Sequence, residues 1–191
     1  MKAKVTPPTI TRAMSAFVEG LCEDVAGQVE LFIYDPPTLD DLFFRFAAAY
    51  TFRERIVVHG QAGWGGYYVA APPHHGFPQE IKVSELGAAI VQALTAHNPA
   101  VPNDAVPSTA MKPVLRALGA RSQKELQAEG KHCWIENNAH GIAITPTHNG
   151  GHRGDQRGFT PLEDRVICLS LAVSDALLGQ ALQDAFERCT S

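Results

Sequence analysis

Histidines in two loop-like segments are the residues of this chain best suited to carry chemistry. His74-His75 follow two prolines, and His148 and His152 lie in a Gly-rich stretch further along the chain. Neutral imidazoles are good metal ligands and general bases, so two such loops in contact would favour a small metal-dependent or His-based hydrolase. Their spacing matches no metal-ligand signature, however, and no Cys or paired Asp/Glu accompanies them. Solvated loop histidines are the simpler interpretation, and we expect no metal and no cofactor.

The other motifs with chemical potential are weaker. The segment His148-Asn-Gly-Gly-His-Arg-Gly-Asp155 is Gly-rich like a phosphate-binding loop, but it lacks the Lys-Ser/Thr ending and opens onto no evident helix. His132 beside Cys133 is not a nucleophile and base, because neighbours on a strand point to opposite faces. Trp64 between glycines is either a core anchor or an exposed contact, and the core is favoured. The sequence therefore predicts a protein that is not an enzyme.

A unit that occurs twice positions both histidine segments. Leu86-Gly-Ala-Ala-Ile-Val-Gln-Ala-Leu94 and Leu178-Gly-Gln-Ala-Leu-Gln-Asp-Ala-Phe186 share Leu, Gly and two Ala at the same offsets. Each follows a strand, a Pro/His/Gly loop and a second strand, which predicts two related strand–loop–strand–helix units over about residues 56–97 and 132–189. Ser84 and Ser174 are expected to cap the two helices. A glycine at the same helical position in both copies indicates a close backbone approach there.

Hydrophobic spacing and turn residues predict the remaining elements. The fold class that they indicate is α+β, with a mixed or antiparallel sheet flanked by helices in a single domain over residues 1–191. A Gly-rich turn is expected over 60–66, and the strand 67–71 is expected to end at Pro72-Pro73. Helices are predicted over 11–25 and 38–50, a short helix is predicted to end at about Leu118, and another is predicted from Ser122 to Gly130. Further strands are predicted over 29–34, 56–58, 132–136, 142–145 and 165–171, the last of them central in the sheet.

Composition limits the function classes. The 191 residues carry a net charge of −4, which argues against a nucleic-acid partner. No apolar run is long enough for a membrane helix or a signal peptide, so we expect a cytoplasmic protein without a membrane partner. The four cysteines lie far apart, which favours reduced thiols. Cys133, Cys168 and Cys189 are interpreted as small buried hydrophobes.

The second unit has the longer loop, and this loop is the candidate binding site. Pro146 and Val173 are 27 positions apart, whereas Pro72 and Val83 are 11 apart. The additional residues are mostly polar, and long polar loops on a rigid scaffold commonly bind partners. For any single acid, an ordinary solvated surface charge is the alternative. The candidate partner-binding residues are Asp155, Glu163 and Asp164, with His148, His152 and Arg153 beside them.

The stretch from about Leu118 to Cys189 carries a family resemblance. It includes Cys133-Trp-Ile-Glu136, Ile142-Ala-Ile-Thr-Pro-Thr-His148, the Gly-rich loop and the last helix. This pattern resembles the immunity proteins of bacterial contact-dependent growth inhibition (CDI) systems, the CdiI type. The segment Leu39-Asp-Asp-Leu-Phe-Phe44 is similar to the opening helix of that group. The resemblance brings no catalytic motif and no residue-level site, so the six candidates rest on the loop alone.

The resemblance implies a cytoplasmic protein that binds and neutralises the cognate C-terminal toxin domain of a CdiA protein. Such toxin domains are often nucleases that cut tRNA or other RNA, and a mildly acidic binder can fill a basic nuclease cleft. Two alternatives come from other classes: the hydrolase built on the paired histidine loops, and a scaffold protein that pairs its sheet edge with a partner.

Overall fold

The computed structural model describes residues 44–64, 67–97, 109–155 and 157–191. The predicted helix 11–25, the predicted strand 29–34, the start of the predicted helix 38–50, Cys22 and the segment 98–108 lie outside these residues. The side chain of Trp64 lies outside them as well.

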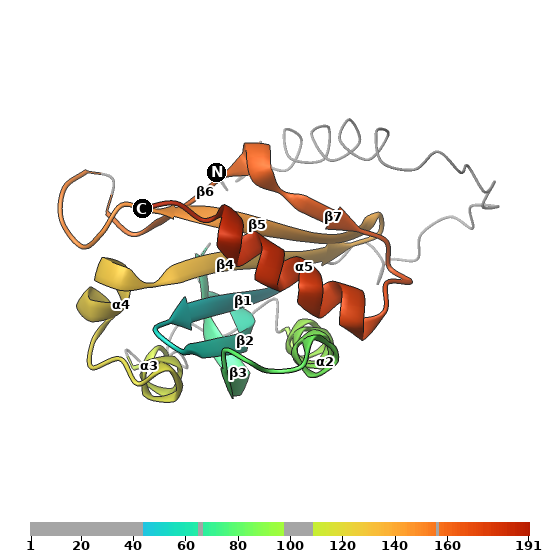
Figure 1. The fold of residues 1–191 in the computed structure, drawn as a ribbon, viewed down its shortest axis with the longest axis horizontal. Helices are drawn as coiled ribbons and strands as arrows, with labels where there is room; N and C mark the ends of the chain where they lie inside the picture. Colours follow the sequence, from blue (N-terminus) through green and yellow to red (C-terminus); the bar gives the residue numbers. More distant parts are fainter. Residues whose placement is uncertain (1–43, 65–66, 98–108, 156) are drawn as a thin grey trace, which may run out of the picture. The chain divides into compact units, whose positions relative to one another are not determined.

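An antiparallel sheet forms the centre of the described fold (Figure 1). Its strand order is β3-β2-β1-β4-β5-β6, and β7 pairs with the same side of β5 as β6 does. The expected α+β class with an antiparallel sheet is thereby confirmed. The strands are β1 (Arg45–Phe52), β2 (Arg55–Trp64), β3 (Tyr67–Pro78), β4 (Lys131–Asn138), β5 (Gly141–Asn149), β6 (Phe159–Pro161) and β7 (Ile167–Leu169).

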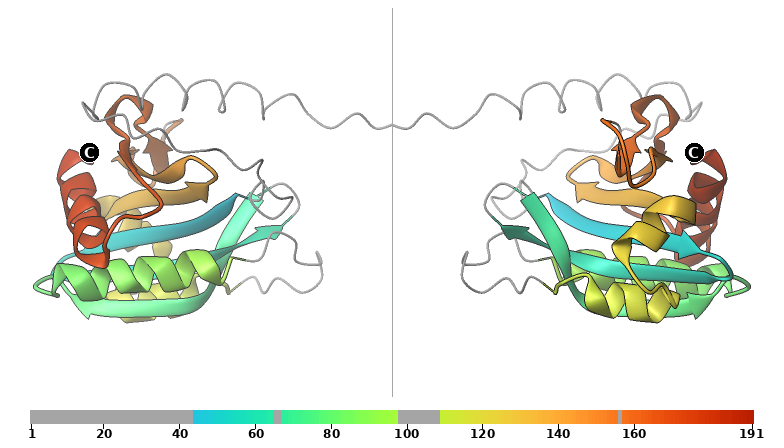
Figure 2. Two further views of the ribbon diagram at one scale, coloured as in Figure 1. Left: turned by 90° about the vertical axis from the view of Figure 1, so that its right-hand side faces the viewer. Right: turned by 90° about the vertical axis from the view of Figure 1, so that its left-hand side faces the viewer.

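Helices cover both faces of the sheet (Figures 1 and 2). The helices α2 (Val83–Thr95) and α5 (Asp175–Arg188) lie together on one face. The short helices α3 (Lys112–Leu118) and α4 (Gln123–Glu129) lie on the other. The Ser122 hydroxyl caps α4 by accepting the Glu125 backbone N–H at 3.2 Å, as its sequence position predicts.

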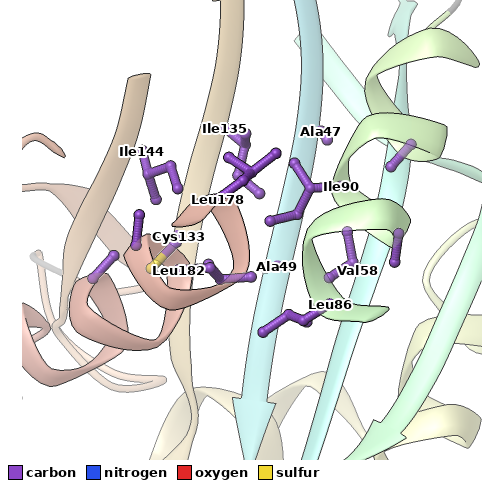
Figure 3. Packing of buried hydrophobic residues seen from close by; sticks show 14 of the residues in the cluster. Ala47, Ala49, Val58, Leu86, Ile90, Cys133, Ile135, Ile144, Leu178 and Leu182 are labelled. Carbon is purple, nitrogen blue, oxygen red and sulfur yellow. The ribbon is translucent and has the colours of Figure 1, made fainter. Parts of the chain in front are cut away.

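Alternation along the strands divides the core between the two faces. Figure 3 shows Ala47 and Ala49 of β1, Cys133 and Ile135 of β4 and Ile144 of β5 facing the two long helices. These helices contribute the stripes that the repeat predicts: Leu86, Ala89, Ile90, Ala93 and Leu94 from α2, and Leu178, Ala181, Leu182, Ala185 and Phe186 from α5.

The prediction of a helix over 38–50 is wrong where the structure describes it. Residues 45–52 form β1, which lies between β2 and β4 in the middle of the sheet. Ala47, Ala48 and Ala49 are each 0% exposed. Alanine has the highest intrinsic helix propensity, but tertiary packing overrides such a preference when a strand is buried on both faces.

The predicted turn at 60–66 is wrong over 60–64, the part that the structure describes, and the predicted strand end at Pro72-Pro73 is also wrong. β2 continues to Trp64, and β3 runs through both prolines and the following histidines. β3 is an edge strand, and its outer side pairs with no other strand. A proline is tolerated there because the backbone N–H that it lacks is not needed for a hydrogen bond on that side. The register shifts between His59 and Gly60, opposite the prolines. A β-carbon on Gly60 would lie 2.8 Å from the Pro72 carbonyl oxygen, so this glycine serves a bulge rather than a turn.

Three smaller predictions also need correction. The expected central strand 165–171 is the three-residue edge strand β7, and Cys168 within it is exposed rather than buried. An apolar run alone does not distinguish a central strand from an edge strand. Ser84 does not cap α2: this helix begins at Val83, and its N-cap Lys82 makes no side-chain capping bond. Ser174 does cap α5, accepting the Leu177 N–H at 3.4 Å.

The predicted close approach at the two helical glycines is confirmed, and it is reciprocal. A β-carbon on Gly87 would overlap the backbone carbonyl of Asp175, the first residue of α5. A β-carbon on Gly179 would overlap the carbonyl of Val83, the first residue of α2. Each glycine therefore receives the first turn of the other helix. The contact concerns the helices alone, and the relation between the two whole units stays a prediction.

Replacing Gly87 by alanine tests this crossing. Alanine improves helix propensity by about 1 kcal/mol, but its β-carbon has no room against Asp175. We expect Gly87→Ala to lower the free energy of unfolding by about 1–3 kcal/mol, the usual cost of overpacking. Urea titration measures this, with Gln92→Ala on the exposed side of α2 as a control within about 0.5 kcal/mol of wild type. A Gly87→Ala protein more stable than wild type would contradict the close crossing.

Candidate functional site

Buried side-chain hydrogen bonds hold the base of the candidate loop. The Asn149 amide at the end of β5 donates to the Gly130 carbonyl oxygen at 2.7 Å and accepts the Gly151 N–H at 2.9 Å. The Thr147 hydroxyl donates to the His132 carbonyl oxygen on β4 at 2.8 Å. Asn149 and Thr147 are both buried, so these bonds form away from competing water. The loop after β5 therefore starts from a fixed position.

The glycines of the loop shape its backbone. Gly151, Gly154 and Gly158 have φ values of 74°, 86° and 95°, a region that residues with a β-carbon rarely adopt. The Gly150 N–H donates to the Gly158 carbonyl oxygen at 2.9 Å, and the Gly158 N–H to that of Gly151 at 2.8 Å. The loop is closed at its neck and leads into β6 rather than a helix. The glycines thus serve loop geometry, and the arrangement of a phosphate-binding loop is missing.

The C-terminal end of α5 and the residues after it form hydrogen bonds with both parts of the candidate surface, the base of the loop and the segment 163–165. Thr190 bonds to β5 in three ways: its oxygen accepts the Asn149 N–H at 2.7 Å, its N–H donates to Thr147, and its hydroxyl lies 2.9 Å from His148 Nδ1. Arg165 of the 3-10 turn η2 (Glu163–Arg165) donates to the Arg188 carbonyl oxygen at 3.0 Å, and Arg188 donates to that of Arg165 at 3.2 Å. The end of α5 therefore anchors both the loop and η2.

The six predicted partner-binding residues fall into two groups on this anchored region. His148, His152, Arg153 and Asp155 come from the end of β5 and its loop, and Glu163 and Asp164 come from η2. The side chains of Arg153, Asp155, Glu163 and Asp164 are exposed, whereas His148 and His152 are half-buried. Asp164 makes one long ion pair of 3.9 Å with Arg165. Within the described chain, Asp155 and Glu163 have no ion pair. Their role in binding stays a prediction.

His152 packs into a cleft that the sequence does not reveal. The cleft lies between the loop and α4, and it is lined by Arg121, Ser122, Lys124, Glu125, Ala128 and His152. The Glu125 carboxylate accepts a hydrogen bond from Arg53 at 2.9 Å and one from the Arg121 backbone N–H at 2.7 Å. Both contacts lower the pKa of this carboxyl, and the contact with Arg121 has the larger effect. The surface beside the loop is therefore of mixed charge, with Lys124 and the Arg121–Glu125 ion pair on the α4 side and acids on the η2 side.

The hypothesis that the two histidine loops meet is wrong. His74 and His75 lie on the edge strand β3, and β2, β1 and β4 separate β3 from β5, which carries His148. Among the residues that the structure describes, no group of three or more His, Cys, Asp or Glu side chains is placed to hold a metal ion. The paired-loop geometry on which the hydrolase alternative depended does not form.

The structure instead assembles a histidine–tyrosine row on the sheet face that α3 and α4 partly cover. His132 of β4 lies opposite Tyr50 of β1, and His59 of β2 lies opposite His74 of β3. The Tyr50 ring is 4.5 Å from the His132 ring and 5.8 Å from the His59 ring, between centroids. Sequence reasoning missed this row because its members lie on four strands. The one available signal was that His132 and Cys133 are neighbours on a strand, so His132 had to point to the sheet face opposite the apolar Cys133.

Burial keeps the imidazoles of this row neutral. His132 and His59 are each 1% exposed. Neither ring nitrogen of His132 has a hydrogen-bond partner in the described structure, and His59 bonds through Nδ1 alone, to the Gly60 carbonyl oxygen. Burial lowers the pKa of His59 to about 4. Burial also lowers the pKa of His132, to about 3, and the nearby His59 contributes to this shift. Burial also raises the pKa of Tyr50.

Exposed aromatic side chains gather at another point that the sequence did not indicate. The Phe46 ring on β1 lies 4.4 Å from Tyr68 on β3 and 5.5 Å from His97 after α2, between centroids. Phe44 and Tyr68 are 38% and 44% exposed. Three distant segments contribute these rings, and the wrong helix prediction for 38–50 concealed two of them.

The family comparison decides what kind of protein carries these features. The sequence matches the CdiI family, described as CDI immunity protein, over residues 45–189. The chain belongs to the CDI immunity protein family. The match spans the whole described sheet and both long helices, so the resemblance that the sequence suggested is confirmed, and a role in immunity follows from it.

Solved structures share the fold of this CdiI family member. A protein of unknown function from Neisseria meningitidis is 18% identical, with a TM-score of 0.65, over 80% of this chain and 99% of that one. A chain of the CdiA-CT/CdiI toxin and immunity complex from Yersinia pseudotuberculosis is 18% identical, with a TM-score of 0.62, over 78% of this chain and 99% of that one. No curated protein matches the sequence. None of the helices described is long and apolar enough to span a bilayer.

The buried histidines should make this CdiI family member sensitive to acid. An unfolded histidine has a pKa of about 6.5, so between there and pH 4 the unfolded chain binds more protons than the folded one. Stability is therefore complete above pH 6.5 and falls as the pH decreases. We expect a loss on the order of 2 kcal/mol for each of His59 and His132 between pH 7 and pH 5. Urea unfolding at the two pH values measures it.

Variants separate this effect from general acid sensitivity. His132→Phe replaces the unpartnered imidazole with an apolar ring, and we expect it to retain stability at pH 7 and to lose less on acidification. His140→Gln changes an exposed histidine and should behave like wild type. An unchanged pH dependence in His132→Phe would show that His132 does not titrate between the folded and unfolded states.

Proposed function

We propose that this protein neutralises the cognate C-terminal toxin domain of a CdiA protein by binding it, and that it does so in the cytoplasm without catalysis. The observation that carries the proposal is the family match over residues 45–189. A chain of a solved CdiA-CT/CdiI toxin and immunity complex shares the fold, which supports the same kind of partner here.

We further propose that the partner binds the surface formed by the loop after β5, η2 and the end of α5. Its exposed acids, Asp155, Glu163 and Asp164, are available to a cationic partner. His148, His152 and Arg153 lie beside them as hydrogen-bonding groups. Because Asn149 and Thr190 already hold the loop base, binding orders few additional residues, and this preorganisation favours affinity.

A nuclease is the toxin class that best suits these charges. A nuclease needs a basic cleft to hold the phosphates of its substrate. A chain of net charge −4 with exposed acids can enter such a cleft, and complementary charge speeds the encounter. A toxin that cuts tRNA or another RNA is therefore the proposed target.

The test is co-purification with the CdiA C-terminal domain encoded immediately upstream, combined with growth of cells that express this toxin. We expect the tagged toxin to retain the protein at micromolar concentration and the protein to restore growth. A CdiA C-terminal domain from an unrelated system serves as the control and should give neither result. Absence of both binding and protection with the upstream toxin would refute the proposed function.

A charge-reversal variant tests the surface in the same assay. We expect Glu163→Lys/Asp164→Lys to bind about tenfold more weakly or worse, a change of about 1.4 kcal/mol, and to show less salt dependence. Glu54→Lys/Glu80→Lys is the matched control, because it changes the net charge equally at exposed positions in other turns. Equal weakening in both variants would indicate long-range charge alone. Normal binding by the η2 variant would place the interface elsewhere.

A further inference from the structure

Cys133 and Cys189 form a close pair of thiols between β4 and the C-terminal end of α5. Their sulfur atoms are 3.9 Å apart. Cys133 is fully buried on the side of β4 that faces α5 (Figure 3), whereas Cys189 is half-buried. Both are thiols in the structure, and a disulfide would bring the sulfur atoms to about 2.05 Å. The pair is therefore within about 2 Å of a covalent bond.

Local geometry allows the remaining approach. Cys189 is the C-cap of α5, with φ of −62° and ψ of 147°, so it lies beyond the last helical turn. Its sulfur is held over β4 by a 3.3 Å contact with the His132 carbonyl oxygen and a 3.5 Å contact with that of Ala185. Because Cys189 lies outside the helical turns, a change in its side-chain rotamer does not require α5 to unwind.

We propose that Cys133 and Cys189 are a site of reversible oxidation, where a hydroperoxide converts the two thiols into a disulfide. The half-buried Cys189 sulfur attacks a peroxide oxygen, the O–O bond breaks, and Cys189 becomes a sulfenic acid while hydroxide leaves. The Cys133 sulfur then displaces the sulfenic hydroxyl, which leaves as water with the help of the Cys133 proton. With hydrogen peroxide, two thiols are oxidised and one peroxide is reduced to two water molecules.

The two sulfurs suit these different roles. The hydrogen bond with the Cys133 thiol lowers the pKa of Cys189 below that of an ordinary thiol, which raises its thiolate fraction relative to that of Cys133. Burial raises the pKa of Cys133, which stays a thiol and is shielded from direct oxidation. Cys189 is therefore the attacking residue, and Cys133 resolves the sulfenic acid.

The disulfide would fasten the tail that holds the loop base. Thr190 follows Cys189 directly and bonds to Thr147, His148 and Asn149. A covalent bond from Cys189 to β4 would reduce detachment of this tail and so stabilise the loop after β5. This inference stands on the thiol geometry and holds whether or not the loop binds a toxin.

The experiment treats the reduced full-length protein with hydrogen peroxide and maps its peptides by mass spectrometry. We expect one peptide pair cross-linked through Cys133 and Cys189, lighter by about 2 Da than the two thiol peptides, and lost on treatment with dithiothreitol. The thermal midpoint of unfolding should rise on oxidation. Absence of this cross-link, or pairing through Cys22 or Cys168 instead, would overturn the proposal.

Single variants assign the two roles. Cys189→Ser should give no intramolecular cross-link and no rise in thermal midpoint, whereas Cys168→Ser should behave like wild type. In Cys133→Ser a hydroxyl can still donate to Cys189, but the sulfenic acid has no resolving thiol, so dimedone should label Cys189 in this variant and not in wild type. Equal dimedone labelling of Cys189 in both proteins would refute resolution by Cys133. If Cys133→Ser fails to fold, the wild-type and Cys189→Ser maps still decide the proposal.

Discussion

The backbones of α2 and α5 touch at two glycines, and the position of everything on that face of the sheet depends on this contact. Gly87 receives the first turn of α5, and Gly179 receives the first turn of α2. Larger residues at either place would separate the helices and expose the apolar stripes that now pack against the sheet. On β1, Ala47 and Ala49 are fully buried in the same core cluster as the helix stripes. The small residues thus determine where α5 runs and where it ends.

The end of α5 is the link between this packing and function. Arg188 at its end bonds to Arg165 of η2, and the two residues that follow place Cys189 against β4 and Thr190 against β5. The candidate surface is thus held by a helix that is itself fixed in the core. Chemical variation in the exposed loop can then change partner specificity without disturbing the core, as expected for an immunity protein that must match one toxin.

Sequence patterns predicted the parts of this structure that depend on local residues. The Ser122 and Ser174 caps, the β4–β5 hairpin and the helix stripes follow from spacing within short segments, and the glycine crossing follows from a glycine at the same position in two similar helices. Apart from the Ser84 cap, a local prediction that failed, the errors arise where distant residues decide. The alanines of β1 form a strand because they are buried between neighbours, and the prolines of β3 are tolerated because that strand is at an edge. The histidine–tyrosine row and the thiol pair join residues from separate elements, so the sequence of a single segment could not predict them.

Amide hydrogen exchange of the protein, free and bound to the CdiA C-terminal domain, tests most directly whether the loop surface is the interface. Exchange reports which backbone groups become protected in the complex. We expect new protection in residues 150–158 and in η2, with β3 unchanged. Protection confined to β3 (Tyr67–Pro78), with none in the loop or η2, would contradict this account and favour pairing at the sheet edge.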